Sequence, residues 1–166
     1  MGDRVLQVGV DDPAIASALA AKVGLTGYAA IAVSDDASAA RTRAAAASAG
    51  ILVDIKVAPA ASLPFESDAF DLLIAHSARG FVSSLDVDAR RAAMREWFRV
   101  LRHGGRVMTI EAGTVTGLKG ILHRQPRNTE YESTGGIVGA LEQAGFKPAR
   151  VLADREGFKF AEGIKA

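Results

Sequence analysis

The chain has 166 residues, of which 49% are hydrophobic and 23% charged, and its formal net charge is +1. This length and composition predict one globular domain over residues 1–166 with enough apolar side chains for a core. The balanced charge predicts neither a nucleic-acid partner nor a membrane-surface partner. The absence of cysteine excludes disulfides, cysteine zinc ligands and a thiol nucleophile. The three histidines, His76, His103 and His123, are far apart in sequence, so we expect no metal site.

The sequence also predicts where the protein resides. Its first apolar strand begins almost at the N-terminus, which leaves no room for a signal peptide. Residues 16–33 are apolar on average, but Lys22, Gly24 and Gly27 divide them into a helix, a turn and a strand rather than a membrane span. We therefore expect a cytoplasmic protein.

The first strand, predicted over residues 5–10, leads into a turn that carries Gly9, Asp11, Asp12 and Pro13. Helical spacing of apolar residues follows this turn. A nucleotide-binding α/β domain places a glycine-rich loop here, because glycines let the backbone approach a ligand. In this chain most of those glycines are missing. Asp12 followed by Pro13 is instead typical of a self-capped helix start, with Pro at the first helical position.

Strands and helices then alternate, which predicts a parallel sheet with helices on both faces. In the clearest helix, Met94, Trp97 and Phe98 lie on one buried face. Ser84 or Asp86 is the predicted cap of this helix, and the sequence His-Gly-Gly at 103–105 is predicted to end it. The further strands are predicted over residues 28–33, 51–57, 70–75 and 106–111.

The C-terminal part changes character. Residues 114–133 are polar and basic without periodicity, which predicts a long loop. Ser133 and Thr134 are predicted to cap a last helix that ends at Gly145. Two strands, over residues 149–152 and 157–160, are then predicted to form a hairpin.

Two blocks of the sequence resemble the class I S-adenosylmethionine-dependent methyltransferases, and most closely their small-molecule branch typified by ubiquinone and menaquinone biosynthesis enzymes. Residues 62–71, SLPFESDAFD, are similar to the family's LPF…FD segment, and residues 96–106, EWFRVLRHGGR, to its E…RVLKPGG junction. The resemblance implies a three-layer α/β/α, Rossmann-like fold with a mostly parallel seven-stranded sheet and an antiparallel strand in a C-terminal hairpin. It also implies S-adenosylmethionine as cofactor.

The family's first motif, D-x-G-x-G-x-G, is degenerate in this sequence. Gln7 occupies the position of its acid and Gly9 that of its first glycine, while Asp11 and Pro13 replace the second and third. The family's acid beside the adenine is absent near residues 59–60. Relative to the family, we also expect the domain to lack the helices that precede the first strand and cover the cofactor. The resemblance thus implies a compromised cofactor pocket.

Candidate roles follow for individual residues, from their place in the predicted sheet for His76 and from the resemblance for the others. His76 follows the fourth strand, where open α/β sheets place their chemistry, and would be a general base or orient a substrate hydroxyl. The alternative is a purely structural role for His76, as a hydrogen-bonded residue at the end of a strand. Asp35 or Asp36 would bind the ribose, although both are also explained as helix caps. The other expected cofactor contacts are Gly9, Val10 and Asp11 at the methionyl end and Ala61, Ser62 and Leu63 near the adenine.

Three functions remain open from the sequence. The first is a methyltransferase-like protein that, if active, methylates a small molecule. The second is a non-catalytic pseudo-methyltransferase that serves as a scaffold, regulatory or oligomerisation subunit, with a second copy or another protein covering its open crevice. The third is a protein that binds another nucleotide or metabolite through the same crevice.

Overall fold

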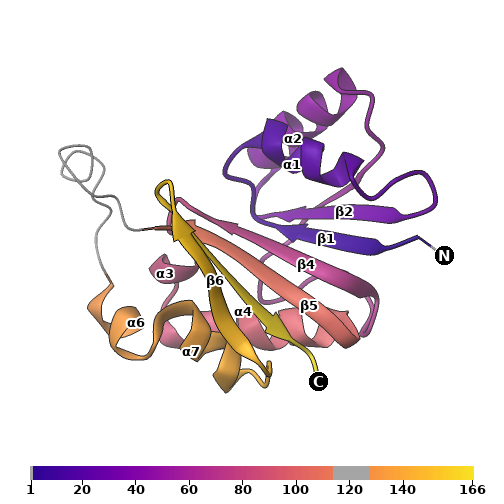
Figure 1. Cartoon of the computed structure of the whole chain (residues 1–166). Helices are drawn as coiled ribbons and strands as arrows, with labels where there is room; N and C mark the ends of the chain where they lie inside the picture. Colours follow the sequence, from indigo (N-terminus) through magenta and orange to yellow (C-terminus); the bar gives the residue numbers. More distant parts are fainter. Residues whose placement is uncertain (1, 114–127) are drawn as a thin grey trace.

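The computed structural model describes residues 2–113 and 128–166 and contains a seven-stranded sheet in the order β3-β2-β1-β4-β5-β7-β6 (Figure 1). The neighbouring strands from β3 to β5 are parallel, whereas β7 is antiparallel to both β5 and β6. The predicted mostly parallel sheet with an antiparallel strand in a C-terminal hairpin is therefore confirmed. The strands are β1 (Arg4–Val8), β2 (Tyr28–Val33), β3 (Asp54–Val57), β4 (Phe70–Ser77), β5 (Leu101–Ala112), β6 (Ala149–Arg155) and β7 (Phe158–Ile164).

Helices lie on both faces of the sheet, as the alternating pattern predicts (Figure 1). Helices α1 (Pro13–Ala21) and α2 (Asp36–Ser48) lie on one face, and α4 (Val87–Val100) and α7 (Gly136–Gln143) on the other. The short helices are α3 (Phe81–Ser84) and α6 (Thr129–Ser133). No helix in the described part of the chain is both long and apolar enough to cross a membrane.

The core is divided by the sheet into a larger and a smaller apolar cluster. The larger cluster joins the sheet to α4 and α7 and includes Trp97 and Phe146, both with 0% exposed surface. Phe98 is partly buried and meets the Phe146 ring edge-on at 5.1 Å between centroids. The smaller cluster, with Ile31 and Ala39, holds α1 and α2 against the other face. The aromatic residues of α4 thus belong to the core, as their spacing predicts.

The end of α4 differs from its prediction. The helix ends at Val100, and the residues that we expected to end it lie inside β5 as a bulge. Gly104, with a φ of 75°, donates its N–H to the Lys165 carbonyl at 2.7 Å, and Lys165 donates back to the Gly105 carbonyl at 2.9 Å. The glycines supply the left-handed conformation and the close backbone approach that this bulge requires.

The predicted cap of the last helix is also wrong. Helix α7 follows Gly135 without a side-chain cap, and Ser133 belongs to α6. The Ser133 and Thr134 hydroxyls instead donate to the Glu130 carbonyl, at 2.9 and 3.1 Å. Helix α6 itself occupies part of the segment predicted as a loop, because Asn128 caps it by accepting from the Tyr131 N–H at 3.1 Å. Residues 114–127 of that segment lie outside the described residues.

Candidate functional site

A cavity of about 160 Å³ lies where β1, β2 and β4 end, at their carboxyl edge. This is the edge at which open α/β sheets bind ligands. Three of the residues predicted from the sequence to hold the cofactor, Gly9, Val10 and Asp11, line it together with the predicted catalytic residue His76. The remaining lining residues are Val8, Ala32, Val33, Ser34, Ser38, Ala58, Ala60 and Phe81.

Gly9 shapes the turn after β1. Its φ is 71°, in the left-handed region, and its N–H donates to the Ala32 carbonyl at 2.9 Å. A Cβ at this position would stand 3.0 Å from the His76 carbonyl oxygen. Both the conformation and the close approach to β4 therefore require glycine.

The two aspartates of this turn are engaged by the protein itself. Asp11 accepts a hydrogen bond from the Ala78 N–H at 2.7 Å and so ties the β1–α1 turn to the residues after β4. Asp12 caps α1 by accepting from the N–H groups of Ala14 at 2.8 Å and Ile15 at 3.4 Å. The N–H groups that an anionic ligand uses at a helix start are thus already bonded.

Asp35 and Asp36, the predicted ribose ligands, are both exposed and do not line the cavity. Asp35 caps α2 by accepting from the Ser38 N–H at 2.7 Å, and it also accepts from the Ser38 and Ser34 hydroxyls. These hydrogen bonds, that of the Ser38 N–H first, hold the pKa of Asp35 below its usual value. Ser34 and Ser38, which were not predicted as site residues, line the cavity themselves.

None of Ala61, Ser62 and Leu63, the residues predicted to border the adenine, lines the cavity. Ala58 and Ala60 line the cavity, whereas Ala61 and Ser62 are exposed outside the lining. Leu63 is 5% exposed, belongs to the core on the α4 side, and donates its N–H to Glu96 Oε1 at 2.8 Å. Alanines at this wall offer an apolar surface without a polar contact.

His76 has a hydrogen-bond partner, Gln7, that was not predicted from the sequence. Its Nε2 lies 2.8 Å from Oε1 of Gln7, and the Gln7 amide donates to the Ala16 carbonyl at 2.8 Å. Both side chains are buried, with 1% of Gln7 and 4% of His76 exposed. Burial lowers the pKa of His76, while the charge of Asp11 acts in the opposite direction. Gln7 is a polar residue within an otherwise apolar first strand, and this feature of the sequence could have indicated that its side chain has a buried partner.

The charge of the cavity lining restricts the classes of ligand that can bind there. Among the described residues that line it, Asp11 supplies a carboxylate and no lysine or arginine is present. A phosphate group would meet a negative charge without a compensating cation. The cavity therefore suits a neutral or cationic ligand better than a nucleotide phosphate. Nowhere in residues 2–113 and 128–166 do three histidine or acidic side chains gather as a metal site.

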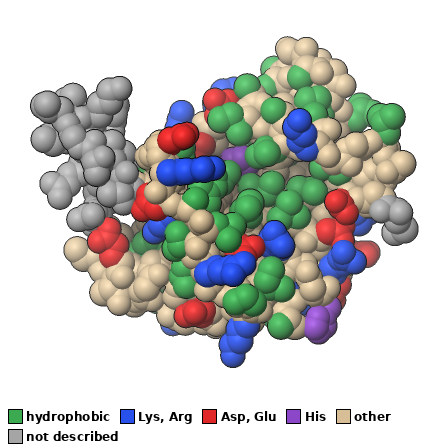
Figure 2. Space-filling view, viewed as in Figure 1, with side chains coloured by type: hydrophobic (Ala, Val, Ile, Leu, Met, Phe, Trp, Pro, Cys, Tyr) green, Lys and Arg blue, Asp and Glu red, His purple; other side chains and the backbone are tan. Residues whose placement is uncertain are grey.

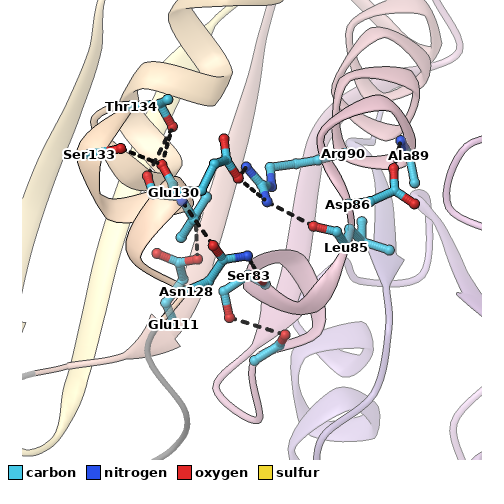
Figure 3. Close-up of polar contacts among 12 residues, drawn as sticks. Ser83, Leu85, Asp86, Ala89, Arg90, Glu111, Asn128, Glu130, Ser133 and Thr134 are labelled. Carbon is cyan, nitrogen blue, oxygen red and sulfur yellow. Dashed lines mark hydrogen bonds and ion pairs between the residues drawn. The ribbon is translucent and has the colours of Figure 1, made fainter.

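A second polar cluster lies at the end of β5, on the α4 side of the sheet (Figure 3). Tyr131 donates to Glu111 Oε1 at 2.7 Å, and both residues are buried. Arg90 contacts Glu130 through two nitrogens at 3.2 Å, and its guanidinium lies 4.6 Å from the centre of the Tyr131 ring. Burial and the Glu111 charge raise the pKa of Tyr131 well above its usual value. This cluster fastens α6 to α4 and β5.

The strand order and the cavity at the carboxyl edge define a Rossmann-like α/β domain of the class I methyltransferase type. A family model described as "Methyltransferase domain" matches residues 6–109, which is more than half of the sequence. The chain belongs to this family. A search of curated proteins gives no significant match.

Solved structures with the same fold include methyltransferases and one enzyme with a different activity. A SAM-dependent methyltransferase from Aquifex aeolicus is 16% identical with a TM-score of 0.76, covering 99% of this chain and 83% of its own. A SAM-dependent methyltransferase from Methanosarcina mazei is 21% identical with a TM-score of 0.66, and the match covers 99% of this chain and 92% of that chain. The [4+2]-cyclase SpnF is 18% identical with a TM-score of 0.67, and the match covers 99% of this chain and 74% of that chain. At these identities the similarity establishes the fold.

Proposed function

We propose that the chain is a single cytoplasmic domain that binds S-adenosylmethionine in this cavity and transfers its methyl group to a small molecule. Its membership of the methyltransferase family and its structural neighbours support this cofactor. The observation that carries the proposal is the charge of the cavity, which has a carboxylate and, among the described lining residues, no cation. S-adenosylmethionine carries a sulfonium and an ammonium but no phosphate, so this lining suits it better than a dinucleotide.

The residues present fit parts of the cofactor. Gly9 brings backbone without a side chain to the cavity wall, and Asp11 lies where it can attract the ammonium of the methionyl end. Ser34 and Ser38 offer hydroxyls for the ribose, held in place by Asp35, and Ala58 and Ala60 form an apolar wall for the base. When bound, the cofactor supplies an electrophilic methyl group.

We also propose that the affinity for the cofactor is weak. The cavity of about 160 Å³ is smaller than the 300–1,000 Å³ of common ligand pockets, so part of a bound cofactor would remain outside it. Asp11 would have to give up the Ala78 N–H to move toward a ligand, and it would also repel the cofactor's carboxylate. Asp12 already uses the helix N–H groups that would bind that carboxylate.

Titration calorimetry with S-adenosylmethionine and S-adenosylhomocysteine tests this proposal. We expect weak binding that Ser38→Ala reduces further, because this change removes a hydroxyl from the cavity wall and a hydrogen bond from Asp35. Asp36→Ala is the matched control, since Asp36 is exposed in the same helical turn and does not line the cavity. Absence of heat at millimolar ligand would refute cofactor binding. Equal loss in both variants would refute the proposed position of the ribose.

A second candidate function, a non-catalytic subunit covered by a partner, is favoured by a partly exposed apolar part of the sheet. On the α1 side of β5 and β7, Met108, Ile110 and Phe160 are partly exposed. Met108 pairs with the buried Ile74 of β4, and Ile110 pairs with Phe160. Figure 2 shows hydrophobic side chains together on the molecular surface over this region, with charged groups around them. Parallel sheets are usually buried on both faces, so this apolar surface is suited to contact with a second copy or another protein.

Light scattering tests this second candidate. If the apolar face is an interface, the wild-type protein associates and Met108→Glu, which places a charge in that face, yields monomers. Val87→Glu is a control, because it adds the same charge at an exposed apolar residue on α4, on the opposite side of the sheet. A monomeric wild-type protein at high concentration would argue against self-association.

A further inference from the structure

The hydrogen bonds of Gln7 determine which nitrogen of His76 carries the proton. The Ala16 carbonyl is an acceptor only, so the Gln7 amide nitrogen must face it, at 2.8 Å. The amide oxygen of Gln7 is then left for His76, and this oxygen is an acceptor only. Because Oε1 lies 2.8 Å from Nε2 of His76, Nε2 must be the protonated nitrogen that donates.

The second ring nitrogen, Nδ1, remains available. In the neutral ring it carries the lone pair, and within the described part of the chain no residue is hydrogen-bonded to it. It is also absent from the fully buried polar atoms that lack a partner, which among the described residues belong to Arg90, Trp97 and Thr109. Since His76 lines the cavity, Nδ1 is the atom through which the ring can contact a ligand there.

We propose that Gln7 is a positioning residue that holds His76 as its Nε2–H tautomer, with Nδ1 presented to the cavity as a proton acceptor for a hydroxyl or amine of the methyl acceptor. This inference rests on the proposed function and specifies its substrate class, an acceptor that loses a proton when it is methylated. The proton leaves the acceptor's oxygen or nitrogen and binds Nδ1, and the imidazolium then releases it to water. The electron pair of the broken O–H or N–H bond stays on the acceptor.

An amide at position 7 keeps the His76 ring neutral to a lower pH than a carboxylate would. A carboxylate accepts from Nε2–H equally well, but its charge stabilises the imidazolium, which has no lone pair on Nδ1. The charged group acting on the ring is Asp11, from the turn after β1. Among the described residues, Gln7 on β1, Ile110 opposite on β5 and Phe81 of α3 in the same cavity wall carry no charge. Gln7 therefore fixes the ring without adding a second negative charge.

Nitrogen-15 NMR of the histidine side chains in the ligand-free protein tests this directly, because chemical shifts distinguish the two tautomers and the imidazolium. We expect a neutral Nε2–H ring for His76, protonated only at a pH below the usual range of histidine. Gln7→Glu should raise the pKa of His76 by about one unit or more. Gln7→Leu removes the acceptor of Nε2–H, so the tautomer preference should be lost. Exposed His103 is an internal control whose signals should not change.

A neutral Nδ1–H tautomer in the wild-type protein would overturn the proposal, and so would a His76 pKa that Gln7→Glu leaves unchanged. The wild-type spectrum decides the tautomer even if a variant does not fold. The result is independent of cofactor binding, which calorimetry measures separately. The Nε2–H tautomer without any heat of cofactor binding would refute the proposed methyl transfer while leaving the Gln7–His76 geometry intact.

Discussion

Replacing Tyr131 with phenylalanine isolates one buried hydrogen bond. The Tyr131 hydroxyl donates to Glu111 at 2.7 Å, with 5% of the tyrosine and 6% of the glutamate exposed. Hydrogen bonds to charged groups contribute about 1.5–3 kcal/mol. Lys159, at 3.5 Å and with 30% of its side chain exposed, still compensates Glu111 in the variant. We therefore expect a loss of about 1.5–2 kcal/mol, near the lower end of that range.

Urea denaturation measures this loss, and a thermal scan should show a decrease in Tm of roughly 3–8 °C for a chain of this size. Tyr28→Phe is the matched control. It also removes a tyrosine hydroxyl that donates to a carboxylate at 2.7 Å, but the side chain of that partner, Asp54, is 34% exposed. Water can replace the lost donor there, so the control should lose less than about 1 kcal/mol. Equal losses in the two variants would refute the argument from burial.

Four further predictions use the same measurements. Because the pKa of Tyr131 is raised in the native protein, Tyr131 loses its phenolic proton above about pH 10 in the unfolded chain but keeps it in the folded one. The free energy of unfolding should therefore fall as pH rises through that range, and it should fall less steeply in Tyr131→Phe. Burial lowers the pKa of His76, so stability should fall as pH decreases below about 6.5, and His76→Gln should reduce this dependence. Gly9→Ala should lower the free energy of unfolding more than Gly50→Ala. Both glycines have positive φ, but a Cβ at Gly9 would stand 3.0 Å from the His76 carbonyl oxygen of β4, whereas one at Gly50 meets nothing within 4 Å. Equal losses would contradict the importance of this contact with β4. Asp12→Ala should cost about 0.5–2 kcal/mol in urea denaturation through the lost cap of α1, and no measurable change would show that water replaces the cap.

Local patterns predicted most of the fold. The spacing of Met94 and Trp97 identified α4, because a helix with one apolar face must bury that face. Asp86 caps α4, as one of the two predicted alternatives, and Asp12 and Asp35 also cap helices. Caps depend on bonds to residues two or three positions along the chain, so a sequence can reveal them.

Elements that depend on distant partners were not predicted. The bulge at Gly104 forms because β5 is hydrogen-bonded to Lys165, and two adjacent glycines look the same in sequence whether they end a helix or bend a strand. Helix α6 is short and is fastened by contacts to Arg90 and Glu111 from other elements. A helix of this length has little stability of its own, so tertiary contacts decide whether it forms.

The candidate site shows the same division between local and tertiary information. From the sequence alone, Gly9 and His76 were placed at the carboxyl edge of the sheet, because each follows or ends an apolar strand. The sequence also showed glutamine at the position for which the resemblance to the methyltransferases implies an acid. Only the parallel pairing of β1 with β4, in which Gln7 lies opposite Ile74, brings Gln7 and His76 onto the same face, across 69 positions of sequence. The tautomer of His76 was therefore decided by the tertiary structure, because a hydrogen bond between remote strands requires their register, which no local pattern specifies.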